Sequence, residues 1–265
     1  MLHPVPAPLD GEALDSLIPG DVPTRPRALA VVDGVLSGRV WVDDPERPTA
    51  GLVIEDADGT VYGGGALTAD HVRAALARVE TASGDLIFGF AGTHDGMRGL
   101  VPTEPYWSGE AIDFTDRVPP ADEDNRLERE LPDGAELARL DRHTLPTVEW
   151  YADTLHAFGS VEAWERLAVG YAVMRDGRPL AECLAGPRCR GLLEMGVVTR
   201  EAERGKGLGT LVSIAVAREC EARGDVVWWN ANAGNAPSLA IARRLGFTRE
   251  RRYELVACRA PLGPA

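Results

Sequence analysis

The segment of residues 194–210 constrains the fold of this chain more than any other stretch. An apolar run from Leu192 to Val198 ends at charged residues, and a second run from Leu211 to Ala217 then continues without Gly or Pro. Three glycines lie between the two runs, Gly205, Gly207 and Gly209. This pattern predicts a strand, a tight turn and the first turn of a helix.

A turn of this kind directs bare backbone N–H groups at one point. Its glycines have no side chains to block a ligand, and the N-terminus of the following helix adds a partial positive charge. Arg204 and Lys206, the only lysine in the chain, add two full positive charges. The sequence therefore predicts a seat for a pyrophosphate.

The glycine spacing decides which pyrophosphate is expected. The chain has no Gly-x4-Gly-Lys-Ser/Thr motif, and Arg204-x-x-Gly207-x-Gly209 does not have the dinucleotide-binding spacing. It resembles instead the coenzyme A loop of the GNAT N-acetyltransferases. Downstream, residues 235–238 followed by residues 245–247 resemble the second coenzyme A element of that family. An ordinary glycine-rich turn between a strand and a helix is the alternative interpretation.

Longer stretches narrow the resemblance within the family. Residues 194–199, Trp229-Asn230 and residues 238–247 are similar to the GNAT branch that includes the zwittermicin A resistance acetyltransferase. Residues 38–50 are similar to the N-terminal region of that branch. The resemblance covers most of residues 30–258, and it is more specific in the second half of the chain.

Composition and charge limit the partners. The 265 residues carry a formal net charge of −13, and the acidic excess lies in the first half of the chain. This asymmetry suggests two units and disfavours nucleic acid and membrane as partners, whereas a cationic small molecule would be attracted. The acidity could equally serve solubility alone.

The cysteine pattern and the chain's start give further expectations. The four cysteines have no Cys-x-x-Cys or Cys/His metal spacing, so we expect reduced thiols and no metal. The N-terminal segment does not read as a leader, and no apolar run reaches the length of a membrane span, so we expect a cytoplasmic protein.

The hydrophobic pattern predicts an α/β fold with a mixed sheet. We expect an extended arm over residues 1–26, a smaller α/β unit over 27–130 and an acetyltransferase domain over 131–265. In the first unit, residues 28–32 are expected to form a strand and residues 109–136 to act as an acidic linker. The second unit reads as a strand, helices, three strands, a helix, a strand, a helix and a strand, which is the GNAT order. The first unit, without a phosphate loop of its own, is expected to be a degenerate GNAT-like half that helps to form the acceptor cleft.

The resemblance implies a set of residues that bind acetyl-coenzyme A. They comprise the strand end, the glycine turn and the second element: Val197, Val198, Thr199, Arg204, Gly205, Lys206, Gly207, Leu208, Gly209, Thr210, Asn235 and Ser238. The pantetheine arm would pair with the end of the strand, and one N–H there would polarise the thioester carbonyl. A primary amine would then attack the thioester directly, without an enzyme nucleophile.

The acid and base of the reaction are less clearly marked. Glu194 is the first candidate for the base, although a Glu paired with a neighbouring Arg is the simpler interpretation. Many GNAT enzymes have a tyrosine acid four residues after the position of Ser238, where this chain has Ala242. Ser238, Tyr253 or water could replace it, and a thiolate leaving group needs little help.

Three further residues are second-rank candidates for contact with the acceptor. These are Glu149, His143 and His156, all in the first helical region of the second unit. The predicted function is acetyl transfer from acetyl-coenzyme A to a primary amine of a small molecule, such as an antibiotic or aminopolyol, by a protein that could form a homodimer. The alternatives are acetylation of a protein or peptide amine, and a catalytically silent sensor of acyl-coenzyme A.

Overall fold

The structure is a computed structural model of the chain. It describes residues 2–8, 18, 22–77, 79–81, 83–90, 99, 101, 105–128 and 130–260. The described chain is a mixed α/β protein in two compact units, formed by residues 1–111 with 252–265 and by residues 112–251. The predicted fold class is therefore confirmed, and each unit is described by itself.

The first unit contains a mixed sheet in the strand order β1-β2-β3-β4-β5-β12. Its strands are β1 (His3–Val5), β2 (Gly38–Val42), β3 (Ala50–Glu55), β4 (Thr60–Gly65), β5 (Asp85–Phe90) and the end of β12 (Phe247–Arg259). Its helices are α2 (Arg25–Val32) and α3 (Ala69–Leu76). Neighbouring strands are antiparallel except for the parallel pair β4 and β5.

Two sequence predictions for the first unit need correction. Residues 28–32 were expected to form a strand, but they complete the buried helix α2, which has Pro26 in its first turn. A short apolar run fits a buried helix as well as a buried strand, so periodicity could not separate the two. The expected N-terminal arm is also partly paired, because His3–Val5 is antiparallel to Val40–Val42.

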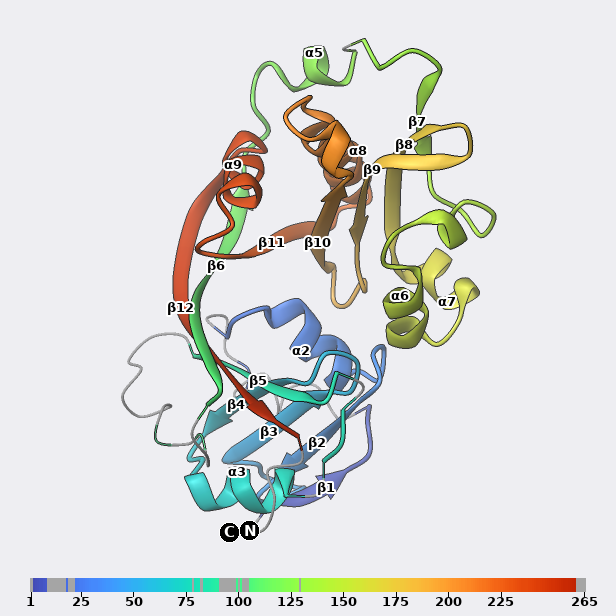
Figure 1. Cartoon of the computed structure of the whole chain (residues 1–265). Coiled ribbons are helices and arrows are strands. Elements are labelled where there is room, and N and C mark those ends of the chain that lie inside the picture. The colour runs from blue at the N-terminus through green and yellow to red at the C-terminus, as the bar shows by residue number, and fades with distance from the viewer. Residues whose placement is uncertain are drawn as a thin grey trace. The chain divides into compact units, whose positions relative to one another are not determined.

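The second unit contains a mixed sheet in the strand order β12-β6-β11-β10-β9-β8-β7 (Figure 1). Its strands are the end of β6 (Trp107–Arg117), β7 (Ala135–Arg139), β8 (Val169–Arg175), β9 (Arg178–Ala185), β10 (Leu192–Thr199), β11 (Val226–Asn232) and the start of β12. Its helices are α5 (Glu123–Leu127), η1 (Leu145–Thr147), α6 (Tyr151–Phe158), α7 (Val161–Leu167), η2 (Glu201–Glu203), α8 (Leu208–Ala222) and α9 (Ala236–Arg244). The predicted order of elements from β7 to β12 is confirmed.

Different helices cover the two faces of this sheet. Helix α8 packs over β8, β9 and β10, and its core includes Cys183, Leu193 and Met195 (Figure 1). The other face carries the neighbours of these residues, since side chains alternate along a strand. On that side η1, α6 and α7 cover a second core that contains Trp164 and Ala172.

The predicted acidic linker is wrong over its first part. Residues 107–117 form the long strand β6, in which Ile112 and Phe114 are fully buried. The buried Asp113 among them accepts a hydrogen bond from the side chain of Asn230 at 2.7 Å and pairs with Arg251. The acids here therefore have partners distant in sequence, which the local charge pattern could not reveal.

The unit boundaries differ from the expected partition for a related reason. The sequence pattern placed one boundary near residue 130, whereas the second compact unit covers residues 112–251. The strands β6 and β12 each contribute residues to both units, so no single point in the chain separates them. The assignment of acetyltransferase function to residues 131–265 stays a prediction.

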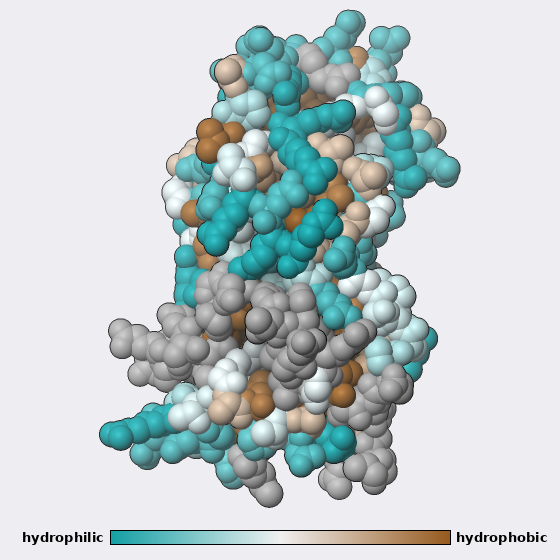
Figure 2. Space-filling model, turned by 90° about the vertical axis from the view of Figure 1, so that its left-hand side faces the viewer, coloured by the Kyte–Doolittle hydropathy of each residue, from teal (hydrophilic) through white to brown (hydrophobic). Residues whose placement is uncertain are grey.

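The visible face over α9 and the start of β12 is mostly hydrophilic, with small and separate apolar areas (Figure 2). Exposed charged side chains in these elements include Arg243, Arg244, Arg249 and Glu250. This is the composition of a solvated surface. None of the helices that the structure describes has both the length and the apolar character needed to cross a membrane.

Candidate active site

The strands β10 and β11 pair over only half of β10. Their parallel register joins residues 192–195 to residues 226–229 and ends at Met195 opposite Trp229. Strand β10 continues to Thr199, still antiparallel to β9. The two strands therefore part after Met195, and among the described residues the β11 side of β10 has no strand partner over its last four residues.

The register shows which backbone groups face this opening. Arg200 N–H donates to Leu180 O and Gly186 N–H donates to Glu194 O, both at 3.0 Å, so the even-numbered residues of β10 bond to β9. In an antiparallel ladder the intervening residues turn their N–H and C=O groups the other way. Val197 and Thr199 therefore present backbone groups to the opening.

The same alternation separates Val198 from its neighbours. Its backbone is turned to β9, where it lies opposite Glu182. The sequence placed Val197, Val198 and Thr199 together as cofactor contacts. In the structure, only Val197 and Thr199 have backbone groups that face the opening. The Val198 side chain lies on the face of the sheet opposite α8.

The glycine turn follows directly and ends at the N-terminus of α8. Gly205 and Gly207 both have φ of 77°, a conformation that a glycine adopts without strain. The first helical hydrogen bond runs from Leu211 N–H to Gly207 O at 3.1 Å. The N–H groups of residues 208–210 thus precede the internal ladder of the helix and are available for an anion.

The glycines of the turn have different roles. A Cβ atom added at Gly205 would meet nothing within 4 Å, so this position is open. A Cβ atom at Gly209 would lie 2.8 Å from the Thr199 hydroxyl and 3.3 Å from Ile241. Gly209 therefore allows α8 to pack closely on β10, while Gly205 keeps the turn accessible.

The two cations of the turn are both engaged with the protein. Arg204 Nε donates to Thr199 O at 3.3 Å, at the end of β10. Lys206 Nζ pairs with Glu203 at 2.9 Å, and Glu203 also contacts Arg175. The pairing with Glu203 reduces the positive charge that Lys206 offers to a phosphate, while Arg204 and Lys206 remain exposed.

The predicted second coenzyme A element forms the start of α9. The Asn235 side-chain oxygen accepts from Ser238 N–H at 3.2 Å and caps the helix. The Ser238 hydroxyl oxygen accepts from the Trp229 indole N–H at 3.1 Å. These bonds leave the Asn235 NH₂ and the Ser238 O–H as the groups that can donate to a ligand.

The structure does not bring the three predicted catalytic residues into one cluster within the second unit. Glu194 lies on β10, on the same face as Gly196 and Val198. Ser238 lies at the start of α9, and Tyr253 is buried in the part of β12 that belongs to the first unit. Ala242, at the position where the resemblance implies a tyrosine, is fully buried.

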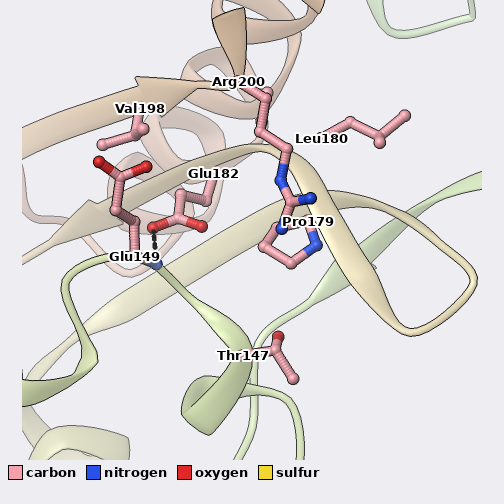
Figure 3. A pocket seen from close by; sticks show the side chains of 8 residues that line it. Thr147, Glu149, Pro179, Leu180, Glu182, Val198 and Arg200 are labelled. Atoms are coloured by element: carbon pink, nitrogen blue, oxygen red, sulfur yellow. Dashed lines mark hydrogen bonds between the residues drawn. The ribbon is translucent and has the colours of Figure 1, made fainter. Parts of the chain in front are cut away.

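A pocket of about 230 Å³ lies on the Val198 face of the second unit (Figure 3). It is lined by Thr147, Glu149, Pro179, Leu180, Ala181, Glu182, Val198 and Arg200. Glu149, one of the three second-rank candidates, is among these residues. His143 and His156 are exposed elsewhere, in the turn after β7 and on α6, and do not line the pocket.

Glu182 is the residue that sequence reasoning missed. It is only 2% exposed, and its Oε1 accepts from Glu149 N–H at 2.8 Å. Burial raises the pKa of the Glu182 carboxyl to about 7, and the negative charge of Glu149 adds to the increase, against the backbone donors and Arg200. A carboxyl group that titrates near neutrality in a pocket can exchange a proton with a ligand. The available signal was an acid within the otherwise apolar strand run 179–185.

The comparisons with known proteins identify the family. A model of the family described as GNAT acetyltransferase matches residues 23–256, which is most of the chain. The chain belongs to the GNAT acetyltransferase family.

Solved structures support the GNAT fold over both units. A GCN5-related N-acetyltransferase-like protein from Streptococcus suis has a TM-score of 0.65 at 20% identity and covers 85% of this chain and 90% of its own. A tandem GNAT protein from the clavulanic acid biosynthesis pathway has a TM-score of 0.58 at 14% identity and covers 100% of both chains. The tandem neighbour fits the two-unit GNAT description.

Among curated proteins, the L-methionine sulfoximine/L-methionine sulfone acetyltransferase of Pseudomonas aeruginosa is 39% identical over 80 residues, 30% of this chain and 43% of that protein. This chain spans about half the length of the curated relatives it matches, or less.

GNAT acetyltransferases use acetyl-coenzyme A, and the residues present fit that group. The opening beside Val197 and Thr199 offers four residues of strand edge that have no strand partner among the described residues, with Thr199 O accepting from Arg204. The open Gly205 and the helix N-terminus lie immediately after it in the chain. Within the described residues, no group of His, Cys, Asp and Glu is arranged to hold a metal ion.

Proposed function

We propose that this protein transfers an acetyl group from acetyl-coenzyme A to a primary amine of a small molecule. The observation that carries the proposal is the parting of β10 from β11 after Met195, followed directly by the open glycine turn and the N-terminus of α8. This combination offers a strand edge for an amide-bearing arm and N–H donors for a pyrophosphate. The methionine sulfoximine acetyltransferase supports a small amine as the acceptor.

The chain's own residues would hold acetyl-coenzyme A by backbone donors and by two side chains. Val197 and Thr199 would bond the pantetheine arm, residues 204–210 the pyrophosphate, and Asn235 and Ser238 the arm from the side of α9. One Val197 or Thr199 N–H would polarise the thioester carbonyl. Acetyl-coenzyme A supplies an activated acetyl group with a thiol as leaving group.

The proposed reaction needs an acceptor amine in its neutral form and no enzyme nucleophile. An amine is mostly protonated at neutral pH, so a carboxylate or a water relay must take its proton. Glu194 stays the sequence prediction for this role, and Glu182 is the group that the pocket geometry adds. Because Ala242 stands at the tyrosine position, Ser238, Tyr253 or water would protonate the departing sulfur.

The narrower predictions from sequence belong to the same proposal. These are the zwittermicin-like branch, an antibiotic or aminopolyol acceptor, a cytoplasmic location and a homodimer. Acetylation of a protein amine and silent binding of acyl-coenzyme A are the competing proposals. The acceptor therefore has to be tested separately from the cofactor.

Calorimetric titration with acetyl-coenzyme A tests the cofactor seat. Gly205 should be changed to Asp and, as a matched control, to Asn, because these are the side chains that best tolerate a positive φ. The two variants share shape and backbone strain and differ by one negative charge. We expect the Asp variant to bind at least about 10-fold more weakly than the Asn variant, because its carboxylate would repel the pyrophosphate.

The outcome separates the proposals. The site is supported if the wild type binds acetyl-coenzyme A and the affinity falls in the Asp variant but not in the Asn variant. Absence of binding by a folded wild-type protein would contradict both the acetyltransferase and the sensor. Binding without acetylation of any amine would favour the sensor.

A further inference from the structure

The pocket lies against the same strand segment as the opening described above. Val198, whose side chain lines the pocket, stands between Val197 and Thr199, whose backbone groups face the opening. A group in the pocket, which touches Val198, and a chain paired with Val197 and Thr199 would therefore meet at the same end of β10. All residues that line the pocket belong to the second unit.

Glu149 and Trp150 are held against the sheet at one side of the pocket. A Cβ atom at Gly196 would lie 2.9 Å from the ring of Trp150, so this ring packs directly on β10. The neighbouring Glu149 N–H is bonded to Glu182 at 2.8 Å, and the Trp150 N–H also donates to that carboxylate. The segment thus has a defined position over the strands.

Two carboxylates and one guanidinium converge on the pocket (Figure 3). The side chains of Glu149 and Glu182 lie beside one another, the first exposed and the second buried. Arg200 extends over the Pro179 side, and its backbone N–H is fixed to Leu180 O at 3.0 Å (Figure 3). The pocket therefore has a negative end and a positive end.

We propose that this pocket binds the acceptor, and that the acceptor is a small zwitterionic amine of the amino-acid type. Its ammonium group lies at Glu149 and Glu182, and its anionic group faces the Arg200 guanidinium. The assignment rests on the proposed function and names the acceptor class of that reaction.

Size and charge both support this class over the alternatives. The volume of about 230 Å³ lies below the range of roughly 300–1,000 Å³ that is typical for drug-sized ligands. An aminoglycoside or a folded protein surface would not enter it. A polyamine would fit the carboxylates but would bring a second cation towards Arg200, whereas a zwitterion pairs with both ends.

The buried carboxylate of Glu182 can also take the proton that the acceptor's ammonium group must lose. Glu182 accepts a proton from the ammonium group, and the neutral nitrogen then forms a bond to the acetyl carbonyl carbon. The bond between that carbon and the coenzyme A sulfur breaks, the nitrogen loses its second proton to give the amide, and the departing thiolate takes up that proton. The products are the N-acetylated zwitterion's anion and free coenzyme A thiol, and Glu182 passes its proton to solvent through the open side of the pocket.

Binding measurements test the site without relying on turnover. The variants are Glu182→Gln, Glu149→Gln and Arg200→Gln, with Glu162→Gln and Arg166→Gln as controls that remove exposed charges on α7. Each protein is first titrated with coenzyme A and then, with coenzyme A present, with L-methionine sulfone, its methyl ester and its N-acetyl derivative. We expect the pocket variants to keep coenzyme A affinity and to bind the zwitterion about 10- to 100-fold more weakly, as for loss of a charged hydrogen bond.

The acceptor class is tested by initial rates over a matched panel. The panel contains the twenty common amino acids, L-methionine sulfone, and the methyl ester and decarboxylated amine of each. We expect at least one zwitterion to have a kcat/KM about 10-fold or more above its ester and its decarboxylated form, and Arg200→Gln to remove this preference.

Two results would overturn the inference. One is equal or faster acetylation of esters, decarboxylated amines or polyamines; the other is acetylation of no zwitterion by protein that binds coenzyme A. With either result, the binding of coenzyme A would still support the proposed acetyltransferase activity. Failure of the wild type to bind coenzyme A would instead remove the proposed function itself.

Discussion

Glu182 shows how one buried side chain can couple pH to folding. Its pKa is raised from 4.5 to about 7, first by burial. Between these two pH values the folded state binds more protons than the unfolded chain. The free energy of unfolding should therefore decrease as the pH rises from about 4.5 to about 7, by about 3 kcal/mol at most.

The test is urea unfolding of the wild type and Glu182→Gln at several pH values. Because glutamine does not titrate, the stability of the variant relative to the wild type should increase with pH across this window. Glu162→Gln, which changes an exposed carboxylate, should show no such trend. A constant difference between Glu182→Gln and the wild type would mean that the Glu182 carboxyl titrates as it does in the unfolded chain.

Residue types indicated the proposed coenzyme A site but not the pocket that we propose for the acceptor. The glycines at 205 and 207 were recognisable because positive φ and an open backbone require glycine locally. The pKa of the Glu182 carboxyl is raised first by burial in the fold, and it is adjusted by Glu149, which is 33 positions away in sequence, and by Arg200. No local pattern contains that information.

At the scale of elements, the contact between α8 and β10 depends on a missing side chain. A Cβ atom at Gly209 would lie 2.8 Å from Thr199 Oγ1, closer than such atoms approach in proteins. Gly209→Ala should therefore destabilise the fold by about 1–3 kcal/mol, through overpacking of the helix against the strand.

A double-mutant cycle measures whether this contact is the cause. Thr199→Ala removes the obstructing hydroxyl, so the double variant should recover part of the stability lost in Gly209→Ala. Urea unfolding of the four proteins gives the coupling. Simple additivity of the two changes would show that the cost arises elsewhere on α8.

The elements themselves were predictable where a pattern was long or punctuated. Strand β10 begins at Leu192, where the apolar run begins, and helix α8 begins at Leu208, within the glycine turn that was expected to lead into a helix. Helix α2 was mistaken for a strand, because its short apolar run has no periodicity to distinguish the two. The long strand β6 was hidden by its acids, of which Asp113 is buried against Asn230.

At the scale of the whole chain, the compact units make a prediction about fragments. Ile112 and Phe114 are fully buried in the same core as Leu211 and Phe247. A fragment of residues 112–251 should therefore unfold cooperatively in urea. A fragment of residues 131–265 lacks both side chains and should bind a hydrophobic dye and unfold over a broad range, since removing buried side chains of this size costs several kcal/mol.

Equal cooperativity of the two fragments would show that the acetyltransferase domain can form without β6. The sequence-based boundary near residue 130 would then describe the folding unit better than the packing of the core does. The full-length chain, measured under the same conditions, is the reference for both fragments.

The sequence by itself determined the strand, turn and helix of the proposed coenzyme A site, the order of elements in the second unit and the family. These depend on local periodicity, on glycines required by positive φ and on motif spacing, all of which are written along the chain. Only the tertiary structure decided that β10 parts from β11 after Met195, that β6 belongs to the core, and that Glu149, Glu182 and Arg200 share one pocket. Each of these depends on strand pairing and burial between distant segments, which determine where a backbone edge stays unpaired and which carboxyl group loses its water.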